Sequence, residues 1–348
     1  MPAGDVFNAY DTVCAGETLY VKFSMGGSGP FNVTVTGEDL PGQTKTGISA
    51  SIDSVAFAPV SSQLFTMYSV EDDSGCFADV SGFVNASHGI VYAVPVANAG
   101  PDDNACGTSY TLQAVKSVTG SSGLWTGTGV SFSDSSSATS LVTAGDYSTK
   151  VLTWTETNWH CTDADDVAIT FDEQPQTPDA GPDQTLDFSF RAQLQAATPL
   201  VGTGKWTVES GTGVFDDDAL PNAVVSELAG ATTLKWTVTN GNCPEVSDIT
   251  EILINPLVIP KGFTPNGDTK NDVFDLGADN AEWIKIKVFN SAGLVVYESD
   301  NYQDGDLWDG YNMDGVELPE GTYFYLITMK IAGKQEEVQF RSFVEILR

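Results

Sequence analysis

The chain has 348 residues, with 47 acidic against 15 basic side chains and a formal net charge of −32 at pH 7. Nucleic-acid binding needs clustered Lys and Arg, so this balance excludes a nucleic-acid partner and disfavours electrostatic docking on anionic membranes. With 41% hydrophobic residues the chain can build packed cores, and its length suits three or four domains.

Two explanations remain for the acidity, which is spread along the chain. Residues 257–348 hold 16 acidic and 8 basic side chains, and the residues before them hold 31 and 7. The first explanation is that acidic side chains keep an exposed extracellular protein soluble. The second is that some of these carboxylates bind divalent cations.

The start of the chain shows no export signal. Met1-Pro2-Ala3-Gly4-Asp5 lacks the basic start and the apolar run of a signal peptide. No apolar stretch approaches the ~18 residues of a membrane helix. We therefore expect Met1 to be an expression start and the chain to be the C-terminal piece of a longer exported protein.

Residues 1–96 are predicted to form a first β-sandwich. Phe31-Asn32-Val33-Thr34-Val35 alternates apolar and polar residues, which is the period of a half-buried strand. A last strand is expected near Gly89-Ile90-Val91-Tyr92-Ala93-Val94, before a linker at Val96-Ala97-Asn98. We interpret this segment as a divergent relative of the two units that follow.

Residues 97–177 and 178–256 are predicted to be two copies of one unit, because four landmarks recur at a spacing of 81 or 82 positions. The landmarks are Ala99-Gly100-Pro101-Asp102 with Ala180-Gly181-Pro182-Asp183, Trp125-Thr126 with Trp206-Thr207, the segment 152–158 with the segment 234–240, and Cys161 with Cys243. Each unit is long enough for a seven-stranded sandwich with a buried Trp pair: Trp125 with Trp154, and Trp206 with Trp236. The units resemble the immunoglobulin-like or PKD-like repeats of large bacterial surface proteins.

The cysteines predict disulfides, which agree with an exported protein. Cys14 with Cys76, and Cys106 with Cys161, lie near the second and the penultimate strand of their domains, so we expect two intradomain bridges. The second repeat has Asp187-Phe188 where the first has its early cysteine. We therefore expect Cys243 to be a buried free thiol left from a lost bridge; an intermolecular link is the alternative.

The sequence predicts that the chain is not an enzyme. The two histidines, His88 and His160, lie near no pattern of a catalytic triad, and we interpret both as surface or packing residues. No phosphate-binding loop, zinc-spaced Cys/His cluster or paired-carboxylate motif occurs. No catalytic or cofactor-binding residue is assigned.

Residues 257–348 are predicted to form a small β-sandwich of hairpins. The segment 283–289 alternates apolar and polar residues, and the segment 294–297 returns after a turn at Asn290-Ser291-Ala292-Gly293. A second hairpin joins 321–329 to 337–344. With no convincing amphipathic helix, the predicted fold class is all-β: tandem sandwich repeats followed by a small C-terminal sandwich.

This last segment also carries short motifs in a fixed order. They are Pro260-Lys261-Gly262-Phe263-Thr264-Pro265-Asn266-Gly267-Asp268, Asn271-Asp272-Val273-Phe274, the segment 288–298, Trp308-Asp309-Gly310 and the segment 318–325. Together they resemble the gliding-motility-associated C-terminal domain, the type B sorting signal of type IX secretion in Bacteroidota. The resemblance implies the C-terminal part of a SprB-like gliding adhesin, which is exported through the periplasm and attached to the outer membrane at the cell surface.

The resemblance further implies the partners and the residues that recognise them. The expected partners are the type IX outer-membrane translocon, a PorP/SprF-like barrel protein and, for the full-length adhesin, an extracellular surface or glycan. The implied recognition residues are Phe263, Asn266, Asp268, Asn271, Asp272, Phe274, Trp308, Asp309, Gly310, Pro319, Gly321, Tyr323, Phe324, Tyr325 and Arg348. The last strand, 338–347, is also a candidate for pairing with a partner strand.

One loop of this domain has two interpretations. Asn266, Asp268 and Asp272 offer oxygen ligands around a glycine, as in part of a calcium loop. Lys270 stands where such a loop has a third acid, so a hydrogen-bonded Asx turn is the alternative. Calcium is the only cofactor that the sequence suggests.

Two other classes of protein stay open at this stage. The repeats could form a carbohydrate-binding module, which would need a row of exposed aromatic side chains on one face. The chain could also be the stalk and sorting tail of a secreted enzyme whose catalytic domain lies upstream. Binding of glycans by residues 1–256, and the sequence of the full-length gene, would separate these two from an adhesin.

Overall fold

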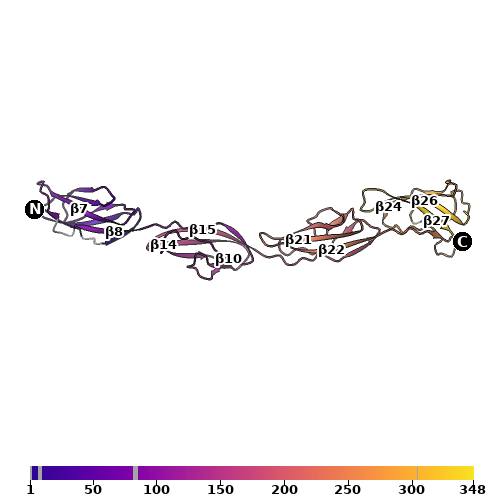
Figure 1. Ribbon diagram of the computed structural model, residues 1–348, viewed down its shortest axis with the longest axis horizontal. Helices are drawn as coiled ribbons and strands as arrows, with labels where there is room; N and C mark the ends of the chain where they lie inside the picture. Colours follow the sequence, from indigo (N-terminus) through magenta and orange to yellow (C-terminus); the bar gives the residue numbers. More distant parts are fainter. Residues whose placement is uncertain (1, 7–9, 81–84, 304) are drawn as a thin grey trace. The chain divides into compact units, whose positions relative to one another are not determined.

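The computed structural model describes residues 2–6, 10–80, 85–303 and 305–348, and the regular elements among them are β-strands (Figure 1). The fold class is therefore all-β, as predicted. By its internal contacts the chain divides into two compact units, Met1–Asp172 and Glu173–Arg348. Each unit contains two hydrophobic cores, so each is built from two successive domains.

The first domain is a sandwich of two sheets. Its strands are β1 (Ala3–Val6), β2 (Tyr10–Cys14), β3 (Leu19–Gly26), β4 (Phe31–Gly37), β5 (Gln43–Ile48), β6 (Ile52–Phe57), β7 (Gln63–Asp72) and β8 (Ala86–Tyr92). A three-stranded sheet, β1-β3-β6, packs on a five-stranded sheet, β2-β8-β7-β4-β5. The apolar residues of the alternating strands, such as Phe23, Val33 and Phe65, point into the core between the sheets.

The second and third domains share one topology. The strands of the second are β9 (Asp103–Cys106), β10 (Ser109–Thr111), β11 (Ser122–Gly127), β12 (Val130–Phe132), β13 (Leu141–Ala144), β14 (Thr149–Asn158) and β15 (Cys161–Asp172). Those of the third are β16 (Gln184–Asp187), β17 (Ala192–Gln193), β18 (Thr203–Ser210), β19 (Val214–Phe215), β20 (Val224–Ser226), β21 (Ala231–Thr239) and β22 (Val246–Asn255). The sheets β11-β14-β15-β9 and β10-β13-β12 of the second domain correspond to β18-β21-β22-β16 and β17-β20-β19 of the third.

The predicted tryptophan pairs form the centre of both repeats. Trp125 lies opposite Trp154 in the strand register, with ring centroids 5.1 Å apart. Trp206 lies opposite Trp236 at the same distance of 5.1 Å. All four rings are buried, so the repeated sequence landmarks mark the repeated core.

The C-terminal domain has one five-stranded sheet rather than two sheets. Its strands are β23 (Gly262–Phe263), β24 (Ala281–Phe289), β25 (Val295–Ser299), β26 (Gly321–Ile331) and β27 (Val338–Ile346), and their order is β23-β27-β26-β24-β25. Both predicted hairpins are present, as β24–β25 and β26–β27. The second layer of this domain consists of loops, whose Phe274, Leu276 and Trp308 cover the inner face of the sheet.

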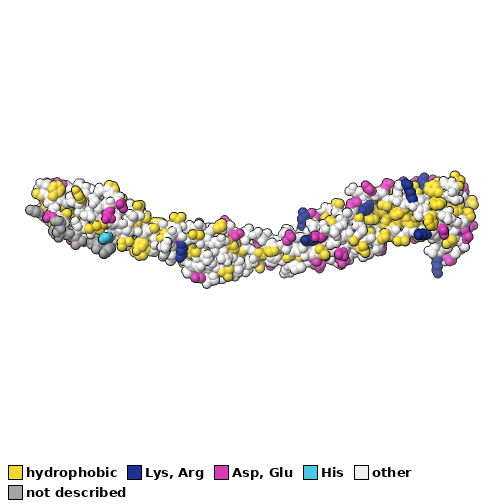
Figure 2. Space-filling model, in the orientation of Figure 1, with side chains coloured by type: hydrophobic (Ala, Val, Ile, Leu, Met, Phe, Trp, Pro, Cys, Tyr) yellow, Lys and Arg dark blue, Asp and Glu magenta, His cyan; other side chains and the backbone are white. Residues whose placement is uncertain are grey.

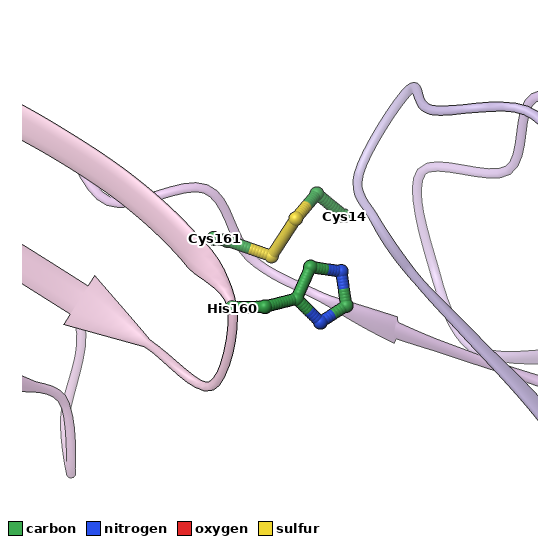
Figure 3. A group of neighbouring side chains, drawn as sticks. All are labelled: Cys14, His160 and Cys161. Carbon is green, nitrogen blue, oxygen red and sulfur yellow. A yellow bond between two sulfur atoms is a disulfide. The ribbon is translucent and has the colours of Figure 1, made fainter.

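The predicted disulfide pairing is wrong. Cys14 bonds to Cys161, 147 positions away, and so joins the first domain to the second (Figure 3). Cys76 is an exposed free thiol instead of the partner of Cys14. Cys106 does not pair with Cys161, and both Cys106 and Cys243 are disulfide-bonded. The expectation of a free thiol at Cys243 is therefore also wrong. The pairing of Cys14 with Cys161 was missed because Cys161 begins β15 at a hairpin tip that contacts the preceding domain.

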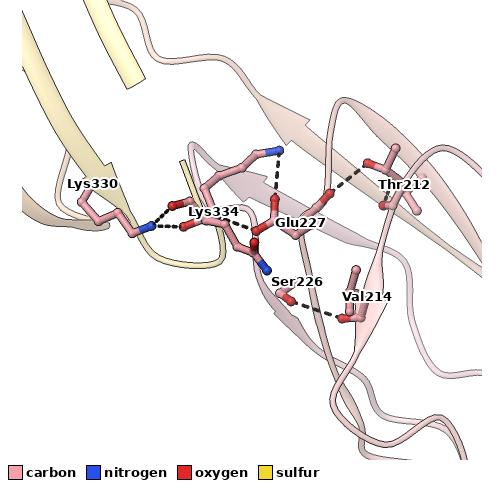
Figure 4. A network of polar contacts seen from close by, with 8 residues as sticks. Thr212, Val214, Ser226, Glu227, Lys330 and Lys334 are labelled. Atoms are coloured by element: carbon pink, nitrogen blue, oxygen red, sulfur yellow. Dashed lines mark hydrogen bonds and ion pairs between the residues drawn. The ribbon is translucent and has the colours of Figure 1, made fainter. Parts of the chain in front are cut away.

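The junction between the third domain and the C-terminal domain is non-covalent. The backbone N–H of Glu227 donates to the carbonyl of Gly333 at 2.8 Å, and its carboxylate accepts from the backbone N–H of Gln335 at 2.6 Å. Lys334 lies 4.0 Å from the same carboxylate (Figure 4). The Lys334 ammonium also lies 4.8 Å from the centre of the Phe190 ring. These contacts attach the tip of the β26–β27 hairpin to the preceding repeat.

Aromatic side chains strengthen this junction. Phe188, which follows β16, is buried and belongs to the core of the C-terminal domain. Its ring lies 6.2 Å from that of Phe340 and 5.5 Å from that of Phe190. The side-chain amide of Asn280 also donates to the carbonyl of Asp187 at 2.8 Å. The C-terminal domain thus completes its core with a residue of the repeat.

Candidate functional site

Five of the residues implied in recognition form the interior of the C-terminal domain. The ring centroids of Phe263 and Trp308 are 5.2 Å apart, those of Phe274 and Tyr325 are 5.6 Å apart, and those of Trp308 and Tyr323 are 5.6 Å apart. All five side chains are buried. They act by holding the loops on the sheet, because a partner cannot touch them in the folded domain.

One member of this aromatic cluster, Tyr302, was not predicted from the sequence. Tyr302 is buried, donates its hydroxyl hydrogen to the carbonyl of Phe274 and accepts from the backbone N–H of Trp308 at 3.0 Å. Burial raises the pKa of Tyr302 above its ordinary value, so the hydroxyl keeps its proton. The available signal was one aromatic residue between two acidic ones, Asp300 and Asp306.

The loop 266–272 is held together by its own carboxylates and backbone. Asp272 accepts hydrogen bonds from the backbone N–H groups of Gly267 at 2.7 Å, Thr269 at 2.6 Å and Asn266 at 2.9 Å. These bonds hold the pKa of Asp272 below its ordinary value. Two Asx turns complete the loop, with Asn266 accepting from Asp268 and Asp268 from Lys270.

These bonds bear on the two interpretations of the loop. Each of the three predicted calcium ligands accepts at least one backbone N–H group, so the Asx-turn interpretation explains why these residue types stand here. Both oxygens of Asp272 are engaged in this way. Calcium binding at Asn266, Asp268 and Asp272 stays an untested prediction.

Several of the remaining residues meet at one end of the domain. The guanidinium of Arg348 lies 2.9 Å from the carboxylate of Glu317 and donates to the carbonyl of Leu318 at 2.5 Å. Gly310 lies against Pro265 and Arg348. The backbone N–H of Leu347 donates to the carbonyl of Phe263 at 3.1 Å. The structure therefore brings the first motif, the Trp308-Asp309-Gly310 motif and the C-terminus together.

The other implied residues have local roles in this end of the domain. The carbonyl of Asn271 accepts a hydrogen bond from the backbone N–H of Thr264 at 2.7 Å. The carboxylate of Asp309 accepts one from the backbone N–H of Tyr311 at 3.2 Å. The carbonyl of Pro319 accepts from the Tyr323 hydroxyl at 2.9 Å. Gly321 begins β26. Only Phe324 among the implied aromatic residues is exposed.

Phe324 belongs to an apolar row on the outer face of the sheet, which we call the Phe row. In the strand register Phe289 lies opposite Phe324, which lies opposite Phe343, and Val295 of the edge strand lies opposite Phe289. Phe324 is 49% exposed and Phe343 is 37% exposed. Figure 2 shows hydrophobic side chains gathered over the part of the surface where β24 and β26 lie. Exposed aromatic rows of this kind are typical of binding surfaces.

Basic side chains border the Phe row. Lys287, Leu326 and Arg341 form the register row two positions along the same three strands, on the same side of the sheet. Lys287 lies 2.9 Å from Glu298, whereas Arg341 bonds to the neutral side chain of Gln339 at 3.2 Å. In a chain of such strong negative charge, this face therefore combines apolar rings with cations.

The last strand is partly covered on its outer side. Among the described residues, β23 pairs with β27 only at Glu345 and Ile346. The edge of Val338–Val344 on that side has no strand partner among them, and β25 forms the opposite edge of the sheet. Pairing of 338–347 with a partner strand stays a prediction. Only 338–344 can take part in it, because β23 already pairs with Glu345 and Ile346.

Comparisons with known proteins found a family match for the C-terminal domain and structural neighbours for the longer chain. Residues 257–346 match the family model of the CHU_C Type IX secretion signal domain, which supports the predicted sorting domain. The titin I-band fragment is 14% identical, with a TM-score of 0.42, over 73% of this chain and 99% of that chain. The ICAM-5 ectodomain fragment is 9% identical, with a TM-score of 0.41, over 100% of both chains. No curated protein matches the sequence.

The fold and the matched domain define a class of protein. An all-β chain of sandwich domains whose residues 257–346 match a type IX secretion signal domain belongs to the class of exported proteins. The type IX secretion signal domain at residues 257–346 implies export of this chain towards the cell surface. Among the described residues, no helix has the length and hydrophobicity of a membrane span.

Proposed function

We propose that this chain is the C-terminal part of a SprB-like cell-surface gliding adhesin. The repeats form the stalk, and the C-terminal domain serves as the type IX export signal and then as the attachment to a PorP/SprF-like outer-membrane barrel. The observation that carries this proposal is the match of residues 257–346 to the secretion signal domain, at the end of a chain of sandwiches.

The Phe row is the surface that we assign to the barrel partner. Aromatic side chains and Arg are the residues that contribute most to protein–protein binding energy, and the row offers Phe324 and Phe343 beside Arg341. Residues of the loop end, such as Asp272 and Arg348, hold the domain in the shape that presents this face.

Surface display of the full chain in a gliding Bacteroidota cell tests this proposal. Phe324→Ser should reduce protease-accessible protein at the surface by about fivefold or more, because loss of an anchor residue of an interface costs over about 1 kcal/mol of binding. Leu294→Ser is the matched control, since Leu294 is exposed in the β24–β25 turn and lies outside the row. A cell without the type IX machinery should show no surface signal.

The structure also decides which deletion is informative. Ending the chain at Arg341 would remove Val344 and Ile346, which are buried, so the domain itself would unfold. Point changes in the Phe row avoid this problem. Normal display of Phe324→Ser and of Phe343→Ser would contradict the assignment of the partner surface. Normal display without the type IX machinery would contradict the export route.

A further inference from the structure

The disulfide between Cys14 and Cys161 connects two strands that lie near opposite ends of the first unit's sequence. Cys14 is the last residue of β2 in the first domain, and Cys161 is the first residue of β15 in the second. The bond closes a loop over a sequence separation of 147. Nearly all of both domains therefore lies inside one covalent loop.

The junction around this bond is packed on several sides. The rings of Tyr92 and Trp159 stack at 4.9 Å, and the side-chain amide of Asn158 donates to the carbonyl of Ala93 at 2.8 Å. His160 lies 3.8 Å from the carboxylate of Glu17. Both sulfur atoms belong to buried residues (Figure 3). The tip of the β14–β15 hairpin is thus fastened to the first domain.

The side chains around the disulfide could also be interpreted as a metal site, but the disulfide itself argues against this interpretation. Ligand atoms of Cys14, His160 and Cys161 lie within 4.8 Å of one another. However, cysteine binds metals as a thiolate, and the two sulfurs are bonded to each other. The mechanical consequence of the bond is independent of any ion.

We propose that this disulfide gives the first unit a further function as a tension bypass. A force that enters at the N-terminus and leaves after Cys161 passes through β1, β2, the disulfide and β15. Residues 15–160 then lie outside the path of the force. The strands in the path are already extended, at about 3.3 Å per residue, so they transmit tension with little lengthening.

The bypass protects the folded state of both domains. Sandwiches linked in a plain row are held against tension by hydrogen bonds, each of which contributes only about 1 kcal/mol net. Here a covalent bond carries the force, and β3 to β14 all lie within the loop. Any binding surface on these strands keeps its shape while the chain is pulled. The inference concerns the first unit alone and does not depend on the proposed export.

Single-molecule stretching of the full chain tests the bypass. One handle is attached to the N-terminus and the other to Thr177, an exposed residue after β15. Cys106 and Cys243 are also disulfide-bonded, and Cys106 lies inside the stretched segment, so the parent protein and all variants are compared in a Cys106→Ser/Cys243→Ser background. In the oxidised protein we expect no release of the length that the loop contains, about 500 Å for 147 residues at roughly 3.5 Å each.

Two variants and a reductant complete the experiment. The double variant Cys14→Ser/Cys161→Ser should release the full length, whereas Cys76→Ser changes the exposed free thiol and should behave as the parent protein. Adding a dithiol to the parent protein at constant force should give the same gain in length. Release of the full length from the oxidised parent protein would overturn the proposal, whether or not the double variant folds.

Discussion

The two units of this chain use the same device at the junction of their domains and secure it in different ways. In both, a hairpin tip of the downstream domain reaches the upstream domain: the β14–β15 tip contacts Cys14 and Tyr92, and the β26–β27 tip contacts Phe190 and Glu227. The first junction is closed by a disulfide and the second by aromatic packing and hydrogen bonds (Figure 4).

The two junctions therefore respond differently to their surroundings. A covalent junction depends on oxidation and is insensitive to moderate loss of packing. A junction built on Phe188 and Glu227 makes the stability of the C-terminal domain depend on the repeat before it. The same difference separates the changes that should disturb one unit from those that should disturb the other.

Removal of the disulfide should have the largest effect and should be confined to the first unit. In the chain-entropy model, a loop with a sequence separation of 147 contributes about 5 kcal/mol to the free energy of unfolding. Denaturant unfolding of Cys14→Ser/Cys161→Ser, followed by hydrogen exchange of β3 to β14, measures this loss. Equal loss of protection in β18 to β22 would show that the two units do not respond separately.

Phe188→Ala should have the next largest effect, in the second unit. A buried Phe replaced by Ala typically costs about 3 kcal/mol or more, and Phe188 packs in the core of the C-terminal domain although it belongs to the repeat. Hydrogen exchange of β26 and β27 should therefore increase. Leu200→Ala, at an exposed position of the same repeat, is the control. Unchanged exchange in β26 and β27 would show that the aromatic contact does not stabilise the C-terminal domain.

Gly333→Ala should open the non-covalent junction at a smaller cost. An added Cβ would lie 2.6 Å from the carbonyl oxygen of Phe190, whereas at Gly315 it would meet no atom within 4 Å. Both glycines have a positive φ, of 85° and 72°, so the backbone strain of alanine is similar. The free energy of unfolding should fall by about 1–3 kcal/mol more for Gly333→Ala than for Gly315→Ala. Equal losses of unfolding free energy in the two variants would show that Gly333 does not contribute to the junction.

Acid should weaken the first unit more than the second, by the smallest of these effects. Glu156 is buried, which acts to raise its pKa, but hydrogen bonds from Ser117, Ser121 and Val118 outweigh the burial and lower the pKa. Val238 takes the equivalent position in the third domain and does not titrate.

The direction of this pKa shift determines whether the second domain loses stability as the pH falls or as it rises. Because the folded-state pKa of Glu156 is below that of the unfolded chain, its contribution is present above the unfolded value and is lost as the pH falls through the folded value. The stability of the second domain should therefore begin to fall as the pH drops below about 5 and should continue to fall through the folded-state pKa of Glu156. Glu156→Gln should make the free energy of unfolding depend less on pH. An unchanged dependence on pH would mean that other carboxylates cause it.

The sequence predicted the parts of the fold that depend on local patterns. The tryptophan pairs were visible because a repeat spacing places Trp125 and Trp154 at fixed positions of two neighbouring strands. The hairpins of the C-terminal domain were visible because residues alternate on both sides of a turn. The all-β class follows from the same alternation.

The parts that depend on contacts between domains were not predictable. Cys14 and Cys161 meet only because a hairpin tip of one domain lies on the next, and cysteine spacing carries no information about such docking. Phe188 was interpreted through the cysteine that it replaces, while its contacts lie in the C-terminal domain. The motifs of the C-terminal domain fall within the matched residues 257–346, but their spacing could not show that Phe263 and Trp308 are buried.

The packing of the tryptophan pairs also defines what a copy of the repeat must contain. A Cβ on Gly123 or on Gly204 would lie 2.0 Å from the facing ring of Trp154 or Trp236. No residue other than glycine fits there, so Gly-x-Trp-Thr and the later Trp-Thr-x-Thr-Asn form one inseparable signature. Scanning longer sequences for this pair of strings would count such domains directly, and a copy without its glycine would mark a repeat that has lost this core.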